Sequence, residues 1–282
     1  MSFFTRMGKG WSMGTASLKL IQKNKQLVLF PIISGIALGA VLATFFGFFY
    51  ANWGFDYSEA MRQGTAADYA LTFLFYLVCY FIIVFFNVGL VHCTRVYLQG
   101  GTPSFSTGVN YSMSRIPVIL GWAMLSATVG LILKAIDEYG GILGSFFSMI
   151  VGVVWSIMTF FVVPILAYEN VGPITALKQS GKIMKEKWGE SIGASFSFGI
   201  FSFIGLLLVA LPIGLLLGAI NPIVGIVAGV LVFFLIQSIV SAAEMVFVAA
   251  VYHELVEEQP VAEFEGLALD DLFEAKKKKG LF

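Results

Sequence analysis

The sequence predicts an all-α, polytopic protein that crosses a membrane six times. Three observations carry this prediction: six long apolar stretches, a composition with 58% hydrophobic and only 12% charged residues, and a one-sided distribution of lysine and arginine between the loops. A soluble domain carries roughly 25% charged residues, so a chain this apolar has too few polar side chains to cover a surface in water. We expect residues 1–253 to form one six-span membrane domain.

The six apolar stretches are each long enough to cross a bilayer. About 20 apolar residues in a helix span a hydrocarbon core of roughly 30 Å. A transmembrane β-barrel would show alternating segments of about ten residues, and the sequence has none. Pro164 and Pro212 are expected to kink spans four and five. The predicted spans are 27–50, 69–93, 117–136, 142–167, 191–220 and 223–252.

Lysine and arginine fall almost entirely on one side of the predicted membrane. With the amino terminus placed inside, all of the 17 basic residues except Arg62 and Lys134 lie in the inner loops and tails. This bias sets the orientation of membrane proteins with short loops. We therefore predict a multi-pass membrane protein with both termini in the cytoplasm, and the short loops fit a bacterial inner membrane.

Each pair of spans is preceded by a short segment of intermediate polarity. The segments 4–24, 103–115 and 173–188 place apolar residues at three- and four-residue spacing on one face and polar or cationic residues elsewhere. A helix of this type lies in the headgroup region of a membrane. We predict three interfacial amphipathic helices on the cytoplasmic side, and a threefold pseudo-repeat of interfacial helix plus helical hairpin.

Ser17, Ser112 and Ser180 occupy similar points of these three segments, which favours a true repeat over three ordinary loops with chance periodicity. The first and third segments also carry lysines on their polar faces. Anionic lipids of the cytoplasmic leaflet attract such side chains, so we expect membrane lipids to be partners of these helices. The lysines expected to contact headgroups are Lys19, Lys23, Lys178, Lys182 and Lys185.

Glu244 is the most unusual residue of the predicted spans. A charged side chain at the centre of a membrane helix costs about 3 kcal/mol on insertion scales, so this carboxylate must face a partner, a cavity or water. One interpretation is a proton- or cation-linked site, and the other is an ion pair with Arg95 or Arg115 near the inner ends of spans two and three. The other polar candidates within the spans are Gln237, Ser241 and Asn87.

The sequence contains no motif of a known catalytic or metal site. It has no glycine-rich phosphate loop, no His-Glu-x-x-His and no nucleophile elbow. It has two histidines, and its two cysteines, Cys79 and Cys93, are about 21 Å apart along one predicted helix. We expect no enzymatic activity, no cofactor, no metal ion and no nucleic-acid partner.

Two features leave room for a protein partner. Gly-x-x-x-Gly pairs occur in mild excess over chance, and they let membrane helices approach closely within a subunit or between subunits. The tail 254–282 is acidic and then carries four lysines, so it is expected to be solvated or to dock on a partner. A homo-oligomer or a membrane-protein partner is compatible with both features.

Two stretches resemble uncharacterised bacterial six-span membrane proteins. One is the opening, from Phe4 to Trp11 and from Lys25 to Pro31. The other runs from Val163 to Asn170, where a span ends in a proline and an acidic residue, and continues to Ser180 as an Ala-Leu-x-x-Ser helix. This second pattern is also similar to the membrane domain attached to some glycerophosphodiester phosphodiesterases. The resemblance implies architecture only, because the sequence has no counterpart of their catalytic domain.

Two functional interpretations follow. In the first, the protein transports a small solute or handles lipid through a polar groove near Glu244. In the second, it is a non-transporting structural or accessory subunit that organises lipid or binds a partner through its interfacial helices and tail. An intramembrane enzyme is disfavoured because no pair of catalytic groups stands out within the spans.

Overall fold

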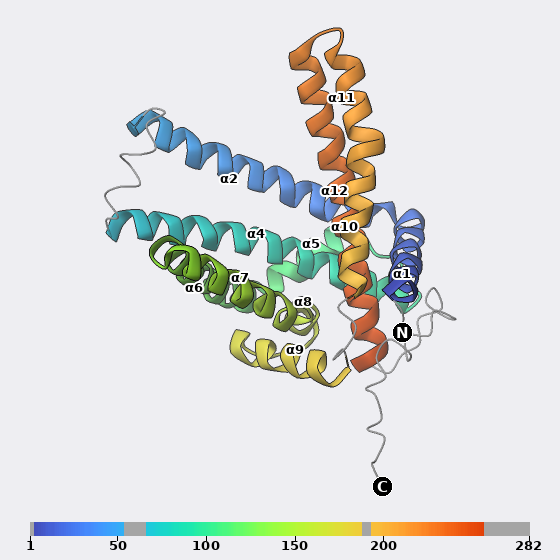
Figure 1. Cartoon of the computed structure of the whole chain (residues 1–282). Helices are drawn as coiled ribbons and strands as arrows, with labels where there is room; N and C mark the ends of the chain where they lie inside the picture. Colours follow the sequence, from blue (N-terminus) through green and yellow to red (C-terminus); the bar gives the residue numbers. More distant parts are fainter. Residues whose placement is uncertain (1–2, 54–65, 188–192, 257–282) are drawn as a thin grey trace. The chain divides into compact units, whose positions relative to one another are not determined.

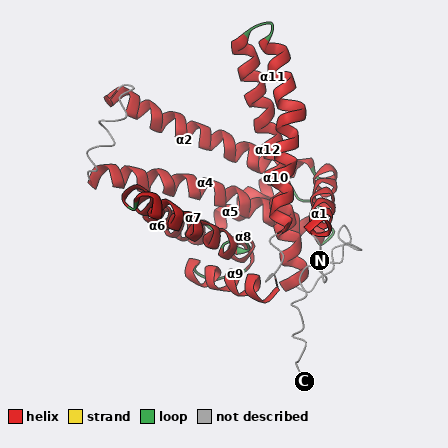
Figure 2. Ribbon diagram, viewed as in Figure 1, coloured by secondary structure: helices red, strands yellow, loops and turns green. Residues whose placement is uncertain are grey.

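The computed structural model describes residues 3–53, 66–187 and 193–256, and this part of the chain consists of helices and turns without a strand (Figures 1 and 2). The all-α class predicted from the sequence is confirmed. The elements are α1 Phe3–Lys23, η1 Lys25–Val28, α2 Leu29–Trp53, α4 Ala66–Leu98, α5 Phe105–Ser114, α6 Ile116–Tyr139, α7 Gly141–Met158, α8 Val162–Tyr168, α9 Pro173–Lys187, α10 Gly193–Gly205, η2 Leu206–Ala210, α11 Leu211–Gly218 and α12 Pro222–Val256.

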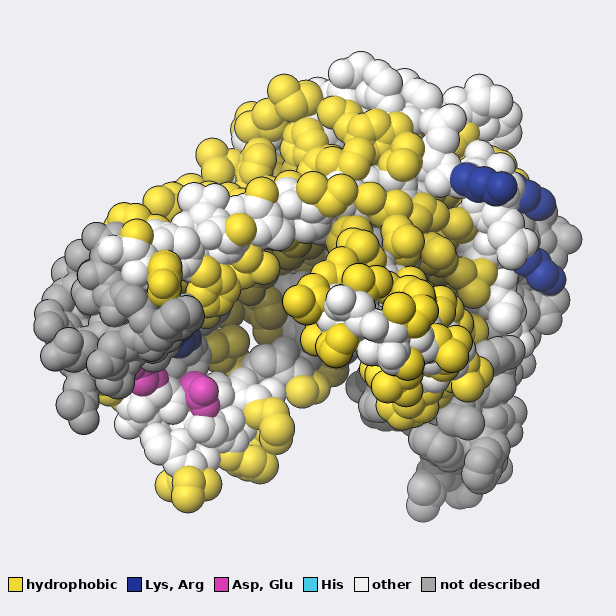
Figure 3. Space-filling view, turned by 90° about the horizontal axis from the view of Figure 1, so that it is seen from above, with side chains coloured by type: hydrophobic (Ala, Val, Ile, Leu, Met, Phe, Trp, Pro, Cys, Tyr) yellow, Lys and Arg dark blue, Asp and Glu magenta, His cyan; other side chains and the backbone are white. Residues whose placement is uncertain are grey.

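Six helical segments are long and apolar enough to cross a membrane. Each of them overlaps one predicted span, so the six-span architecture is confirmed and the chain is an integral membrane protein. In the view of Figure 3, most coloured side chains on the described surface are hydrophobic. The segments are Lys25–Phe48, Tyr69–Leu98, Ile116–Tyr139, Gly141–Tyr168, Phe198–Gly218 and Pro222–Glu254.

The order of one short helix followed by two spans occurs three times along the chain. The short helices are α1, α5 and α9, and each lies close to its predicted range. The location of these helices at a membrane surface, and the side of the membrane on which they lie, stay predictions.

Two of the spans are interrupted just before a proline. Span four divides into α7 and α8 at the turn Thr159–Phe161, three residues before Pro164. Span five contains η2, a wider π-helical turn that ends two residues before Pro212. Proline has no N–H for the carbonyl four residues earlier, and its ring clashes with that carbonyl. The kinks expected at both prolines therefore take the form of these interruptions.

The chain divides into two compact units. Unit 1 comprises Met1–Ile32, Leu90–Gly108 and Lys182–Phe282, and unit 2 comprises Ile33–Gly89 and Val109–Gly181. In unit 1, α1 packs against α10 and α12. The buried side chains of this core come from α1, from the carboxyl-terminal end of α4, and from residues 242–253 of α12. Of the predicted tail 254–282, residues 254–256 form the end of α12 and residues 257–282 lie outside the described residues.

Unit 2 is held together by aromatic contacts and close helix packing. Trp122 of α6 stacks on Trp155 of α7 with ring centroids 5.8 Å apart and planes 5° from parallel. Phe45 of α2 lies 4.5 Å from Phe75 of α4, measured between ring centroids. Gly144 lies so close to α6 that a Cβ there would be 2.3 Å from the carbonyl oxygen of Ile136.

Candidate functional site

Three of the predicted polar residues form a stripe along α12. Gln237, Ser241 and Glu244 follow a spacing of four and then three residues within one uninterrupted helix, and this spacing places side chains on the same helix face. Gln237 and Ser241 are exposed, and Glu244 is half-buried. The structure therefore brings together the three span-six candidates, which we call the polar stripe.

The polar stripe has no hydrogen-bond or ion-pair partner among the described residues. The neighbouring Ser238 behaves differently, because it is buried and its hydroxyl donates to the carbonyl oxygen of Phe234 at 2.9 Å. Polar groups at membrane depth are expensive unless they find a partner, a cavity or water. The stripe is thus a set of unsatisfied polar groups on an otherwise apolar helix.

The two candidate arginine partners of Glu244 lie in different units. Arg95 stands in the last turn of α4 in unit 1, is half-buried and takes part in an interaction within the chain; its pair with Glu244 stays a prediction. Arg115 belongs to unit 2, where its Nη2 donates to the Tyr111 hydroxyl at 3.3 Å and its guanidinium lies 5.6 Å from the Tyr111 ring centroid. A pair between Glu244 and Arg115 stays a prediction.

Asn87 belongs to unit 2, whereas the polar stripe belongs to unit 1. It lies on α4 in unit 2 and is half-buried, and its amide makes no hydrogen bond to another described residue. Its expected bond across a helix interface stays a prediction.

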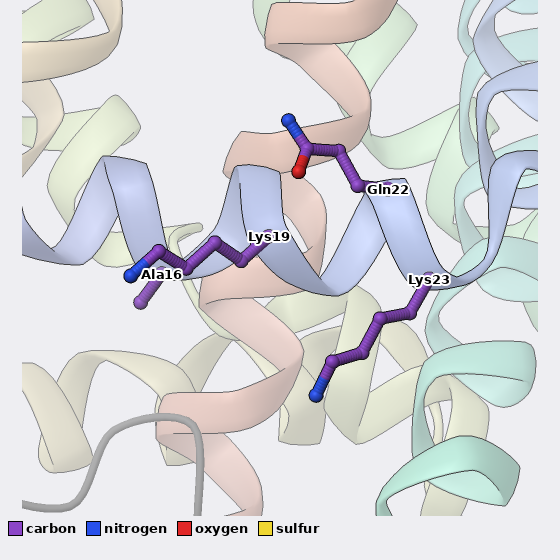
Figure 4. Close-up of a pocket in the computed structure, with 4 residues that line it drawn as sticks. All are labelled: Ala16, Lys19, Gln22 and Lys23. Atoms are coloured by element: carbon purple, nitrogen blue, oxygen red, sulfur yellow. The ribbon is translucent and has the colours of Figure 1, made fainter.

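The lysines of α1 stand beside a shallow pocket. This pocket of about 440 Å³ is lined by Ala16, Lys19, Gln22 and Lys23. Lys19 and Lys23 extend back along α1 toward its amino terminus, whereas Gln22 points away from Lys23 (Figure 4). Both lysines are exposed, so their ammonium groups are accessible to an anionic headgroup.

The lysines of α9 repeat this exposed arrangement in part. Lys178, Lys182 and Lys185 are all exposed. Ser17-Leu18-Lys19 and Ser180-Gly181-Lys182 also share a serine two residues before the lysine. α1 and α9 therefore present a buried serine and an exposed lysine at matching positions.

The three serines of the repeat are all fully buried, at 0% exposure. The Ser112 hydroxyl donates to the carbonyl oxygen of Phe85 at 2.7 Å. The Ser180 hydroxyl accepts from the backbone N–H of Phe161 at 3.0 Å, within the interruption between α7 and α8. The Ser17 hydroxyl has no hydrogen-bond partner among the described residues. The sequence predicted the matching positions of the three serines, but it did not predict that Ser180 accepts a hydrogen bond at the break between α7 and α8.

An apolar groove of about 650 Å³ runs between η2–α11 and α12. Its lining includes Gly214, Gly218, Gly225 and Gly229. These glycines let the two helices touch, because a Cβ on Gly225 would lie 2.3 Å from the Cα of Gly218. The Gly-x-x-x-Gly pairs 214/218 and 225/229 are therefore used for packing within the chain. Larger side chains that line the groove are Leu206, Leu211, Leu215, Ile226, Val230 and Phe233.

No group of three or more His, Cys, Asp or Glu side chains suited to a metal ion occurs in the described segments. Cys93 is buried, and its thiol donates to the carbonyl oxygen of Ser104 at 3.3 Å. It therefore contributes to the packing of unit 1.

Comparison with known proteins identifies a family without assigning an activity. No curated protein matches the chain. The resemblance to the membrane domain of glycerophosphodiester phosphodiesterases is not shown, whereas the expected relation to an uncharacterised family is confirmed. The model of a family of unknown function, DUF6159, matches residues 66–261 and so covers the last five spans. The chain belongs to this family.

Proposed function

We propose that this protein moves a small solute or a lipid headgroup along the polar stripe of α12. The observation that carries the proposal is the set of three polar side chains on one face of a membrane span, without a protein partner in the described residues. Unsatisfied amide, hydroxyl and carboxylate groups within an apolar span require water or a polar ligand beside them. A hydrated groove along Gln237, Ser241 and Glu244 meets this requirement.

The cationic short helices support lipid handling in particular. The exposed lysines of α1 and α9 suit contacts with anionic headgroups. For this role, α1, α5 and α9 and both termini lie on the cytoplasmic side of an inner membrane, which is the side that the distribution of basic residues predicts. The proposal assigns no catalytic chemistry to the chain.

Reconstituted vesicles test this function. We expect the full chain to accelerate either the exchange of a fluorescent phospholipid between leaflets or the efflux of a trapped small solute. Glu244→Gln keeps the side-chain shape and removes the charge, and we expect it to slow that rate about tenfold. Glu138→Gln is the matched control, because Glu138 is an exposed carboxylate at the end of α6 in unit 2. Rates equal to those of protein-free vesicles in both assays would contradict the function.

A structural or accessory role is the second candidate. It is favoured by the low burial of spans five and six, where only 6% and 11% of the most apolar window are buried. Such faces suit contact with lipid, with another membrane protein or with a second copy of the chain. Under this alternative the protein co-purifies with a defined partner and shows no flux, and removing residues 257–282 releases the partner.

A further inference from the structure

The larger α12 side chains of the apolar groove lie on the same helix face as the polar stripe. Ile226, Val230 and Phe233 line the groove, and Gln237, Ser241 and Glu244 continue the same three- and four-residue spacing. At about 100° per residue, all six side chains fall within an arc of roughly 80° around the helix axis. One face of a single span therefore changes from apolar to polar along its length.

The apolar part of this face matches the length of a lipid chain. The groove residues of α12 extend from Pro222 to Phe233, which corresponds to about 16 Å of helix. One leaflet contributes about half of the roughly 30 Å hydrocarbon core. Ile226 and Val230 are 68% and 62% exposed, so the groove is open to an acyl chain from the side.

We propose that α12 binds one membrane amphiphile lengthwise, with an acyl chain in the groove and a polar end on the stripe. The carboxylate of Glu244 accepts hydrogen bonds, and the amide of Gln237 and the hydroxyl of Ser241 both donate and accept them. This set of groups suits a polar end that donates hydrogen bonds, such as the ammonium of ethanolamine or the hydroxyls of glycerol. The inference rests on the proposed function and names its substrate class.

A second copy of the chain fits this face less well than an amphiphile. A symmetric contact presents the same patch from both subunits, so the two Glu244 carboxylates would approach one another in an apolar surrounding. Like charges in that setting disfavour association. A small polar solute would use the stripe but leave the groove without an occupant.

Native mass spectrometry of the full-length protein with defined lipids tests the inference. Three probes share the same acyl chains: phosphatidylethanolamine, phosphatidylglycerol and phosphatidylcholine, whose headgroup has neither an N–H nor a hydroxyl donor. We expect the protein to retain the first two more strongly than the third. A preference for the first or the second alone identifies the ammonium or the hydroxyls as the recognised group.

Two valine-to-phenylalanine substitutions distinguish binding in the groove from binding elsewhere on α11 and α12. Val230→Phe places an aromatic ring in the groove, and we expect about tenfold weaker retention of lipid. Val224→Phe is the matched control, because Val224 is also exposed, at 51%, but does not line the groove. Ala219→Leu fills the groove from the turn that follows α11 and provides a second variant if Val230→Phe fails to fold.

Three results would overturn the inference: equal retention of all three lipids, equal effects of Val224→Phe and Val230→Phe, or dimers in place of lipid adducts. Its failure is distinguishable from that of the proposed function. If Glu244→Gln stops flux but Val230→Phe leaves lipid retention unchanged, the proposed function holds and the binding of an amphiphile in the groove is contradicted. If lipid is retained as described without any flux, the inference stands and the function fails.

Discussion

The two ends of α12 are both mainly apolar but have different surroundings. Residues 242–253 are almost entirely buried, with Ala242, Val246 and Val251 fully covered. Residues 222–231 are mostly exposed, with Ile223 at 73% and Ile226 at 68%. Both ends are apolar, so hydropathy alone does not tell them apart. The difference comes from neighbours, because α1 and α10 pack on α12 in unit 1, whereas the first part of α12 has α11 as its partner along the glycine pairs.

Membrane solvation explains why an apolar helix tolerates both surroundings. In water, exposed leucine and isoleucine would favour burial in protein, but lipid chains are as apolar as leucine and remove that driving force. The buried end of α12 therefore owes its stability to specific packing all around the helix, whereas the exposed end packs only along its glycine contact with α11. Substitutions in the two ends should consequently differ in their effects on stability.

The largest difference is expected for truncation of a buried ring. Phe247 is 1% exposed and lies 5.9 Å from Phe198 between ring centroids. Phe247→Ala removes these contacts and leaves a cavity, and we expect it to lower the free energy of unfolding by about 3 kcal/mol. Val224→Ala in the exposed end should change it by less than about 0.5 kcal/mol. Unfolding in detergent micelles measures both, and equal losses would show that the ends are packed alike.

A smaller effect is expected where the exposed end packs most closely on α11. At Gly225 a Cβ would lie 2.3 Å from the Cα of Gly218 and 2.5 Å from the carbonyl oxygen of Gly214. Backbone atoms cannot rotate away, so Gly225→Ala must separate α11 from α12, and we expect a loss of about 2 kcal/mol.

Gly39→Ala is the control for this substitution, because a Cβ at Gly39 meets nothing within 4 Å. It should be neutral or stabilising by up to about 1 kcal/mol, the helix propensity gained. Thermal unfolding of Gly225→Ala and Gly39→Ala under the same conditions compares their losses of stability. A tolerated Gly225→Ala would mean that the hairpin is looser than its glycine contacts indicate.

Hydropathy and charge were sufficient to predict the spans, because bilayer thickness imposes a length on every apolar helix. The three short helices were predictable because their apolar residues recur with the helical period. Whether each span is surrounded by lipid or by protein could not be predicted, since both surroundings favour the same apolar side chains.

The spacing of Gln237, Ser241 and Glu244 was visible in the sequence, but only the structure shows that these side chains have no partner among the described residues. The ion pair of Glu244 with Arg95 or Arg115 stays a prediction, because the depth of a residue along its span does not specify which helix faces point together.

The smallest effects are expected for the polar groups inside the buried regions. Ser180 accepts a hydrogen bond from the Phe161 N–H at the break of span four, so Ser180→Ala leaves a buried donor unsatisfied and should cost about 1–2 kcal/mol. Ser17 is equally buried, yet its hydroxyl has no partner among the described residues, and Ser17→Ala should cost nothing or stabilise slightly.

Unfolding in detergent compares the two serine variants directly, and Ser180→Thr is a further control because threonine keeps the hydroxyl. If Ser17→Ala is as costly as Ser180→Ala, the Ser17 hydroxyl has a partner in the folded protein. Ser17 and Ser180 would then be equivalent in energy as well as in position. If only Ser180→Ala lowers the free energy of unfolding, the repeat preserves the burial of the serine but not its hydrogen bond. That bond then depends on which helix each short helix packs against.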